Sequence, residues 1–202
     1  VSSAVLFSDI SVDGITCHPS NNGPTNDGAI SITVAQGAAP STVTITQPVG
    51  GDITQTLQEG TPRRFSGLRP GDYTIQITDN SNPVNTIDTV VTITQPDEFV
   101  VQFDETNPTC FNEPNGSVQA NILVNGFQVP NPESLFSFDW SYTDLDTSVI
   151  DSVVGGIPIS LTITNESGCM ESGSTTLSNP QPITFTPILT PAQCSGKNNG
   201  SV

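Results

Sequence analysis

The feature that most constrains this chain is a short motif that occurs three times. In each copy a cysteine is followed by turn-forming residues, then by Asp-Gly or Asn-Gly, and then by small and β-branched residues. The copies begin at Cys17, Cys110 and Cys194, at intervals of roughly 90 residues, about the size of one β-sandwich domain. The motif therefore predicts a tandem array with two complete units and the beginning of a third.

The unit boundaries can be read from the strands that end in proline. We assign residues 1–96 to the first unit, 97–180 to the second, and 181–202 to the first strands of a truncated third unit. A new alternating segment begins within a few residues of Pro96 and of Pro180. A flexible linker is longer and richer in Gly and Ser, so we expect the units to form a stiff, extended rod.

Alternation of apolar and polar residues is the dominant secondary-structure signal. This pattern places one side chain in a core and the next in water, and threonine on the wet face keeps strand propensity. Gly, Pro, Asn and Asp separate the segments and supply turn chemistry. The clearest segments are 29–34, 43–46, 73–78, 90–94, 118–124, 136–142 and 159–164. The sequence thus predicts an all-β protein built of tandem Ig-like β-sandwich repeats in an extended rod.

The charge balance narrows the partners. Twenty acidic residues stand against four basic ones, for a net charge of −16, so nucleic acid is a poor partner because phosphate binding needs Lys and Arg. We also predict no membrane insertion, since no apolar run is long enough to span a bilayer. Acidic oxygen atoms could hold Ca²⁺, with Asp144, Asp146 and Asp151 as possible ligands. The alternative is that these carboxylates only solvate a loop.

The aromatic residues gather on one predicted strand. Phe136, Phe138 and Trp140 alternate with polar residues, so their side chains share one face. We expect that face to lie in the core. The alternative is an exposed aromatic platform that stacks on sugar rings, as in carbohydrate-binding modules.

Three of the four basic residues, Arg63, Arg64 and Arg69, lie within seven positions. Local ion pairs with Asp72 or Glu59 are the first expectation for such a spot on an acidic chain. The alternative is contact with an acidic partner or a neighbouring unit.

The order of motifs in the second unit, completed by one turn of the first, resembles the SprB repeat of large surface adhesins in gliding bacteria. In that family an early cysteine precedes an Asn-Gly-Ser turn, followed by an aromatic strand with Trp-Ser, a Gly-Leu turn before a tyrosine strand, and a final Gly-Cys. The matching residues here are Cys110, Asn115-Gly116-Ser117, Phe136 to Ser141, Gly168-Cys169, and, in the first unit, Gly67-Leu68 and Tyr73.

No catalytic motif stands in the sequence, so we expect no enzyme activity and no cofactor apart from the possible Ca²⁺. The resemblance implies a structural and adhesive repeat region of a secreted adhesin at the cell surface, which extends and presents a binding tip in gliding motility or attachment. It also implies export by the type IX route. The implied partners are neighbouring repeats of the same chain and surface polysaccharide or other cell-surface proteins. Two alternatives are a carbohydrate-binding accessory module of a secreted enzyme and a subunit of an extracellular filament.

The resemblance also implies a disulfide within the second unit. Cys110 and Cys169 stand at the two cysteine positions of one repeat, and their bridge would indicate an oxidising, extracellular setting. A loop of that length is worth about 4 kcal/mol in a chain-entropy model. Cys17 then lacks a partner in its own unit, and the partner of Cys194 would lie beyond this sequence. The alternative is that all four cysteines are free thiols.

Overall fold

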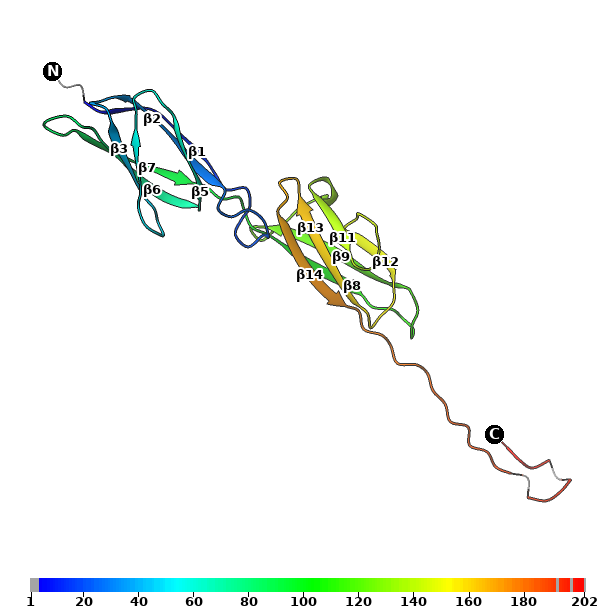
Figure 1. The fold of residues 1–202 in the computed structure, drawn as a ribbon. Coiled ribbons are helices and arrows are strands. Elements are labelled where there is room, and N and C mark those ends of the chain that lie inside the picture. Colours follow the sequence, from blue (N-terminus) through cyan, green and yellow to red (C-terminus); the bar gives the residue numbers. More distant parts are fainter. Residues whose placement is uncertain (1–3, 192, 197, 202) are drawn as a thin grey trace.

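The chain forms two β-sandwich domains in series, followed by an extended C-terminal segment (Figure 1). The computed structural model describes residues 4–191, 193–196 and 198–201, so Val202 of the third motif lies outside them. One short 3-10 helix, η1 (Pro132–Ser134), interrupts the strands. The predicted class, all-β with tandem Ig-like sandwiches in an extended rod, is confirmed.

The first domain comprises β1 to β7, all paired antiparallel. One sheet has the order β1-β2-β5 and the other the order β4-β3-β6-β7. Apolar side chains from alternate positions of both sheets fill the space between them. The strands are β1 (Leu6–Asp13), β2 (Gly28–Gln36), β3 (Ser41–Thr46), β4 (Ile53–Leu57), β5 (Arg63–Leu68), β6 (Gly71–Thr78) and β7 (Thr86–Ile93).

The second domain comprises β8 to β14 and has its own core. In one sheet, β9 is the central strand and pairs with β8, β10 and β12. The other sheet has the order β11-β13-β14. The strands are β8 (Phe99–Thr106), β9 (Gly116–Val124), β10 (Phe127–Gln128), β11 (Phe136–Trp140), β12 (Val149–Val153), β13 (Pro158–Asn165) and β14 (Met170–Thr176).

The two domains share one strand order. The sheet β1-β2-β5 corresponds to β8-β9-β12, and β3-β6-β7 corresponds to β11-β13-β14. Strands β4 and β10 are additions at sheet edges. Equivalent positions in the two domains can therefore be compared residue by residue.

Each copy of the cysteine motif forms a loop, and the same hydrogen bond closes all three. The residue before the cysteine donates its backbone N–H to the Asp or Asn side chain that precedes the glycine. The pairs are Thr16 with Asp27 (3.0 Å), Thr109 with Asn115 (3.0 Å), and Gln193 with Asn199 (3.2 Å). We call residues 16–27, 109–115 and 193–199 the first, second and third Cys loops.

The glycine that follows each of the first two Cys loops is required by close packing at the start of the next strand. A Cβ atom added to Gly28 would lie 2.9 Å from the carbonyl oxygen of Leu68, and one added to Gly116 would lie 2.9 Å from that of Val153. Contacts this short do not occur for real side chains, so only glycine lets the two strands approach.

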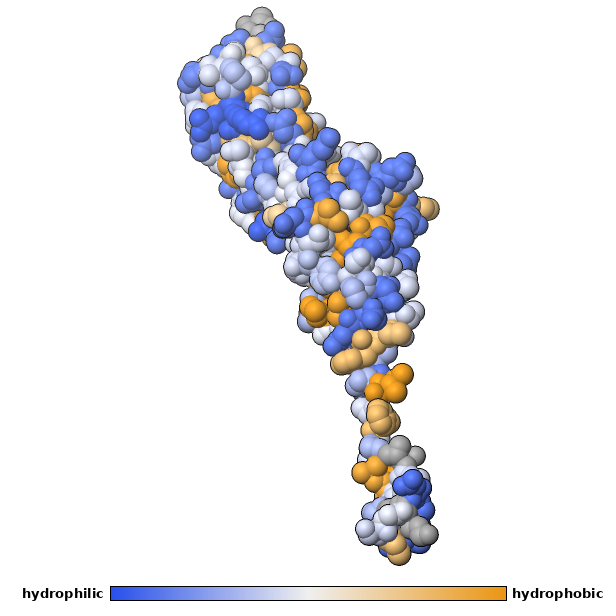
Figure 2. Space-filling model, turned by 90° about the vertical axis from the view of Figure 1, so that its right-hand side faces the viewer, coloured by the Kyte–Doolittle hydropathy of each residue, from blue (hydrophilic) through white to orange (hydrophobic). Residues whose placement is uncertain are grey.

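The C-terminal segment leaves the second domain as a narrow tail (Figure 2). In its described part, the only strand-like pairing is a bridge between Thr190 and Ser201. This bridge repeats the pairing of Thr106 with Ser117 at the end of β8. That residues 181–202 are the first strands of a third unit stays a prediction.

Candidate functional site at the interdomain joint

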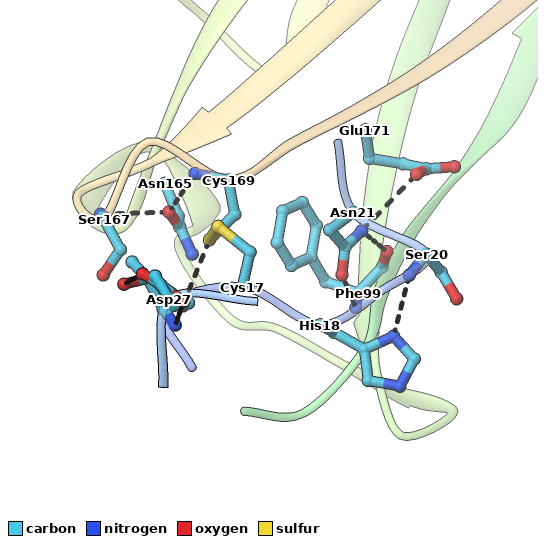
Figure 3. Close-up of a disulfide and its surroundings, with 11 residues drawn as sticks. Cys17, His18, Ser20, Asn21, Asp27, Phe99, Asn165, Ser167, Cys169 and Glu171 are labelled. Carbon is cyan, nitrogen blue, oxygen red and sulfur yellow. Dashed lines mark hydrogen bonds between the residues drawn. A yellow bond between two sulfur atoms is a disulfide. The ribbon is translucent and has the colours of Figure 1, made fainter. Parts of the chain in front are cut away.

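A disulfide joins the two domains. Cys17, in the first Cys loop, is bonded to Cys169, in the hairpin between β13 and β14, with a Cα–Cα distance of 5.5 Å (Figure 3). Cys17 is fully buried and belongs to the core of the second domain, although the first domain supplies it. The expected bridge between Cys110 and Cys169 is therefore wrong, and Cys110 is a free, exposed thiol.

The length of the sandwich explains this outcome. Phe136 pairs with Asn165, and its ring lies 5.0 Å from that of Phe99, so the β13–β14 hairpin lies where β8 begins. Cys110 follows the other end of β8, which at the usual strand rise is roughly 24 Å away. A disulfide needs Cα atoms within about 7 Å. The cysteine that reaches this hairpin is the one from the preceding domain.

Next to the disulfide, the side chain of a buried asparagine pairs with the backbone of β8 as a neighbouring strand would. The Asn21 side chain donates from Nδ2 to the carbonyl oxygen of Phe99 (2.7 Å), and its Oδ1 accepts the Phe99 N–H (3.1 Å). Asn22 adds a backbone bridge to Met170 at the edge of β14. The first Cys loop thus extends the hydrogen bonding of the second domain at both β8 and β14.

We call the two hydrogen bonds between the Asn21 side chain and the Phe99 backbone the Asn21 clamp, and two titratable residues border it (Figure 3). Burial raises the pKa of Glu171, which accepts a hydrogen bond from Asn21 Nδ2 (3.4 Å). His18, beside the disulfide cysteine, accepts the N–H of Ser20 at its Nδ1 (3.2 Å) and so helps to shape the loop. The disulfide links the two domains covalently at this joint, and thiol exchange can open such a bond.

The hairpin that carries Cys169 has a counterpart in the first domain. Asn165 Oδ1 accepts the N–H groups of Ser167 and Cys169, both at 3.0 Å. In the β6–β7 hairpin, Asp79 accepts in the same way from the N–H groups of Ser81 (3.1 Å) and Asn85 (3.0 Å). Asn85 therefore stands where the second domain has its bonded cysteine.

Asp79 is held as a carboxylate by this network. The hydroxyl group of Ser81 donates to it (2.5 Å) and is the largest cause that lowers the pKa of Asp79, assisted by hydrogen bonds from Asn85 and opposed by burial. In the first domain, a charged residue thus organises the hairpin that a neutral Asn165 organises in the second.

The predicted basic spot is dispersed. Arg64 forms an ion pair with Asp13, both side chains being more than half exposed. For Arg64, the partner therefore differs from Asp72 and Glu59, which were the expected partners of the three arginines as a group. Asp72 instead accepts a hydrogen bond from the hydroxyl group of Thr92 (2.6 Å).

The other two arginines have different settings. Arg69 lies in the β5–β6 turn, where its backbone N–H donates to the Tyr73 hydroxyl (3.1 Å) and its carbonyl accepts from it (2.9 Å). This arrangement resembles the tyrosine corner of Ig-like domains. Arg63 lies exposed on β5. A partner contact through Arg63, Arg64 and Arg69 stays a prediction.

The three acidic residues considered as Ca²⁺ ligands have different settings, and Ca²⁺ binding stays a prediction. Asp146 Oδ1 accepts the N–H of Phe138 (2.6 Å) and so fixes the loop to β11, while Asp144 and Asp151 are exposed. The three carboxylates are not brought together, and within the described residues no group of three Asp, Glu, His or Cys could hold a metal ion.

The aromatic strand lies in the core, as expected. Trp140 is 3% exposed, and its indole N–H donates to the carbonyl of Thr147 (2.8 Å). Phe138 is buried beside it and Phe136 is partly buried. The alternative of an exposed sugar-stacking platform at Trp140 is wrong.

Comparison with known proteins finds matches among solved structures, at low sequence identity. No family model and no curated protein matches this chain. A C-terminal 282-residue fragment of intimin, solved with the intimin-binding domain of the translocated intimin receptor, matches with 12% identity and a TM-score of 0.38. A structure on Dscam isoform specificity matches with 16% identity and a TM-score of 0.30. The alignments cover 86% and 88% of this chain, and 64% and 46% of those chains.

The joint contains the features that sequence reasoning missed. The first Cys loop, 16–27, is five residues longer than the second, 109–115. That difference in length was the available signal that the first loop reaches beyond its own domain. A separate observation concerns membranes: in the part of the chain that the structure describes, no helix is long and apolar enough to cross one.

Proposed function

We propose that this chain is a stalk region of a secreted cell-surface adhesin, built to carry tension between its two ends. The observation that supports this most is the position of the disulfide between Cys17 and Cys169. It links two residues separated by 152 positions and joins two domains that the backbone already connects.

The disulfide provides a covalent shortcut along the rod. β1 leads directly into Cys17, and Cys169 leads directly into β14, which runs towards the C-terminal segment (Figure 1). A pull on the two ends therefore passes through β1, the disulfide and β14. The residues from 18 to 168, which contain most of both cores, lie outside this path.

This path is already close to its full length. β-strands rise by 3.2–3.4 Å per residue, near the maximum of an extended chain, so β1 and β14 yield little length when pulled. Unfolding of the bypassed residues would release on the order of 500 Å in a chain without the disulfide. With the disulfide intact, that length is unavailable to the pulling force.

The setting and the finer role follow from the chemistry and the resemblance. Structural disulfides belong to oxidising compartments, and the strongly acidic composition keeps a long array soluble. We propose an extracellular, surface-anchored location on these grounds. The resemblance to SprB repeats supports gliding motility or attachment as the purpose, with type IX export, and neighbouring repeats and surface polysaccharide or proteins as partners.

Single-molecule pulling between the two ends of the chain tests the mechanical proposal. We expect the oxidised protein to show no large unfolding step, whereas reduction or C17S should produce steps that sum to on the order of 500 Å. C110S is the matched control, because Cys110 is a free thiol, and it should behave as the unaltered protein does. Large steps in the oxidised protein would contradict the proposal.

A further inference from the structure

The second Cys loop is a copy of the first without the bond. It is closed by the same hydrogen bond, from the N–H of Thr109 to Asn115, and it presents Cys110 as an exposed thiol. Phe111, which occupies the place of His18, is 46% exposed. In the first copy the corresponding Cys17 is fully buried in the core of the neighbouring domain, whereas Cys110 is not covered by any part of the described chain.

The second Cys loop lies where the chain leaves the second domain. Asn112 donates its N–H to Asn179 Oδ1 (3.1 Å), and Asn179 Nδ2 donates to Asn112 Oδ1 (2.8 Å). These two bonds hold the loop against the outgoing segment. A shallow depression there is lined by Cys110, Phe111, Pro182 and Ile183, among others. The first Cys loop has the same place beside the connection to β8.

The outgoing segment has the pattern of a first strand whose core is missing. Ile183 and Phe185 are 99% and 87% exposed, and Figure 2 shows hydrophobic residues along this narrow part. They follow Pro180 as Phe99 and Val101 of β8 follow Pro96. Phe99 is buried in its domain. Removal of such apolar side chains from water is favourable.

We propose that Cys110 is the donor of a second interdomain disulfide, formed with the hairpin cysteine of a β-sandwich domain whose first strand is segment 183–189. This inference rests on the proposed stalk function. The incoming domain covers Cys110 and Phe111 as the second domain covers Cys17. The joint carries no counterpart of the Asn21 clamp, because the second Cys loop is shorter.

The direction of these links follows from the hairpins. A link runs from the Cys loop of one domain to the β-hairpin of the next, as Cys17 does to Cys169. The β6–β7 hairpin of the first domain has Asn85 at that position, so the first domain provides a Cys loop but no acceptor cysteine. The same rule assigns Cys194 of the third Cys loop as the donor of a further link.

The bond forms by thiol–disulfide exchange. Cys110 and the hairpin cysteine each lose one proton and one electron as their S–S bond forms. A disulfide of a dithiol carrier protein accepts the two electrons and two protons and becomes two thiols. The Cα atoms must approach to within about 7 Å, which the folded joint enforces at Cys17.

Disulfide mapping of the intact protein from its native source tests the proposal. The protein is alkylated, cleaved at Asp and Glu without reduction, and analysed by mass spectrometry. We expect a Cys110 peptide bonded to a peptide of the domain that contains segment 183–189, with its cysteine in a turn between two alternating segments. The C110S variant should release one new thiol, in that same peptide.

The other outcomes overturn the inference. They are an alkylated Cys110, a bond from Cys110 to Cys194, or a bond to Cys110 of a second chain. The peptide pair of Cys17 and Cys169 is read in the same experiment. If that pair is intact while Cys110 is alkylated, only the second joint fails. If that pair is missing, the proposed stalk function fails as well.

Discussion

The two domains share a strand order but stabilise the same hairpin by different means. In the first domain, Asp79 gathers hydrogen bonds from Ser81 and Asn85 within the hairpin itself. In the second, Asn165 makes the equivalent turn, but Cys169 is bonded to Cys17 of the other domain. The first hairpin is complete within its own domain, whereas the second depends on a neighbour.

This difference shows how a repeat becomes part of an array. A solenoid or tandem protein gains stability from each unit and from each interface between neighbours. Here the first Cys loop contacts the second domain at the β13–β14 hairpin, through the disulfide, and at the start of β8, through Asn21. Asn85 and Cys169 hold the same position in the two hairpins, and of these two it is Cys169 that carries the interdomain disulfide.

The largest expected effect is that removal of Cys17 lowers the stability of one domain and not of the other. In C17S we expect the free energy of unfolding of the second domain to fall by about 3–5 kcal/mol, since the chain-entropy model assigns this much to a loop of that size. The first domain should change little. Trp140, the single tryptophan, reports the second domain by fluorescence during denaturation.

C110S is the control for this experiment and should leave the Trp140 transition within about 0.5 kcal/mol, because the residue is exposed and unbonded. An equal loss in both domains for C17S would contradict the comparison. So would a Trp140 transition that does not move.

The next effect sharpens the role of the clamp. N21A leaves the N–H and carbonyl of Phe99 without their buried partner, which costs about 1–3 kcal/mol. N22A is the matched control, since Asn22 is exposed and uses its backbone for the bridge to Met170. Denaturation followed by Trp140 fluorescence should show a lower stability of the second domain in N21A than in N22A. Equal stability of the two variants would show that the Asn21 clamp does not stabilise the joint.

The smallest expected effect is the loss of stability of the first domain in acid. Because the folded state lowers the pKa of Asp79, its contribution to stability is present above about pH 4, the ordinary range of a carboxyl group, and is lost as the pH falls further. Asn165 does not titrate. We therefore expect acid to weaken the first domain before the hairpin of the second responds.

Hydrogen exchange of amides in β6 and β7, measured between pH 5 and pH 3, tests this expectation. D79N should remove most of the pH dependence of their opening. D88N, which removes an exposed carboxylate from β7, is the control and should keep that dependence. An unchanged pH profile in D79N would show that the Asp79 network does not hold the hairpin.

Much of the fold was predictable from local patterns. The alternation in 73–78 and 118–124 predicted β6 and β9, because period two places alternate residues in a core whatever the partner strand is. The face shared by Phe138 and Trp140 predicted their burial for the same reason. The Asp-Gly and Asn-Gly steps marked strand starts, where a close backbone approach admits only glycine.

Contacts between distant elements were not predictable in this way. Arg64 pairs with Asp13 because β2 lies between β1 and β5 in the sheet, an order that no local pattern contains. The resemblance predicts a disulfide within one repeat, but the observed bond joins two domains. Cys110 and Cys169 lie at opposite ends of a sandwich, and only the packed domain reveals that separation.

The sequence by itself determined the repeat, the strands and the residues that face each core, since these depend on periodicity and on turn chemistry along the chain. The tertiary structure alone decided which domain each cysteine serves. A disulfide forms between atoms a few ångströms apart, and strand order, strand length and the direction of the joint set that proximity.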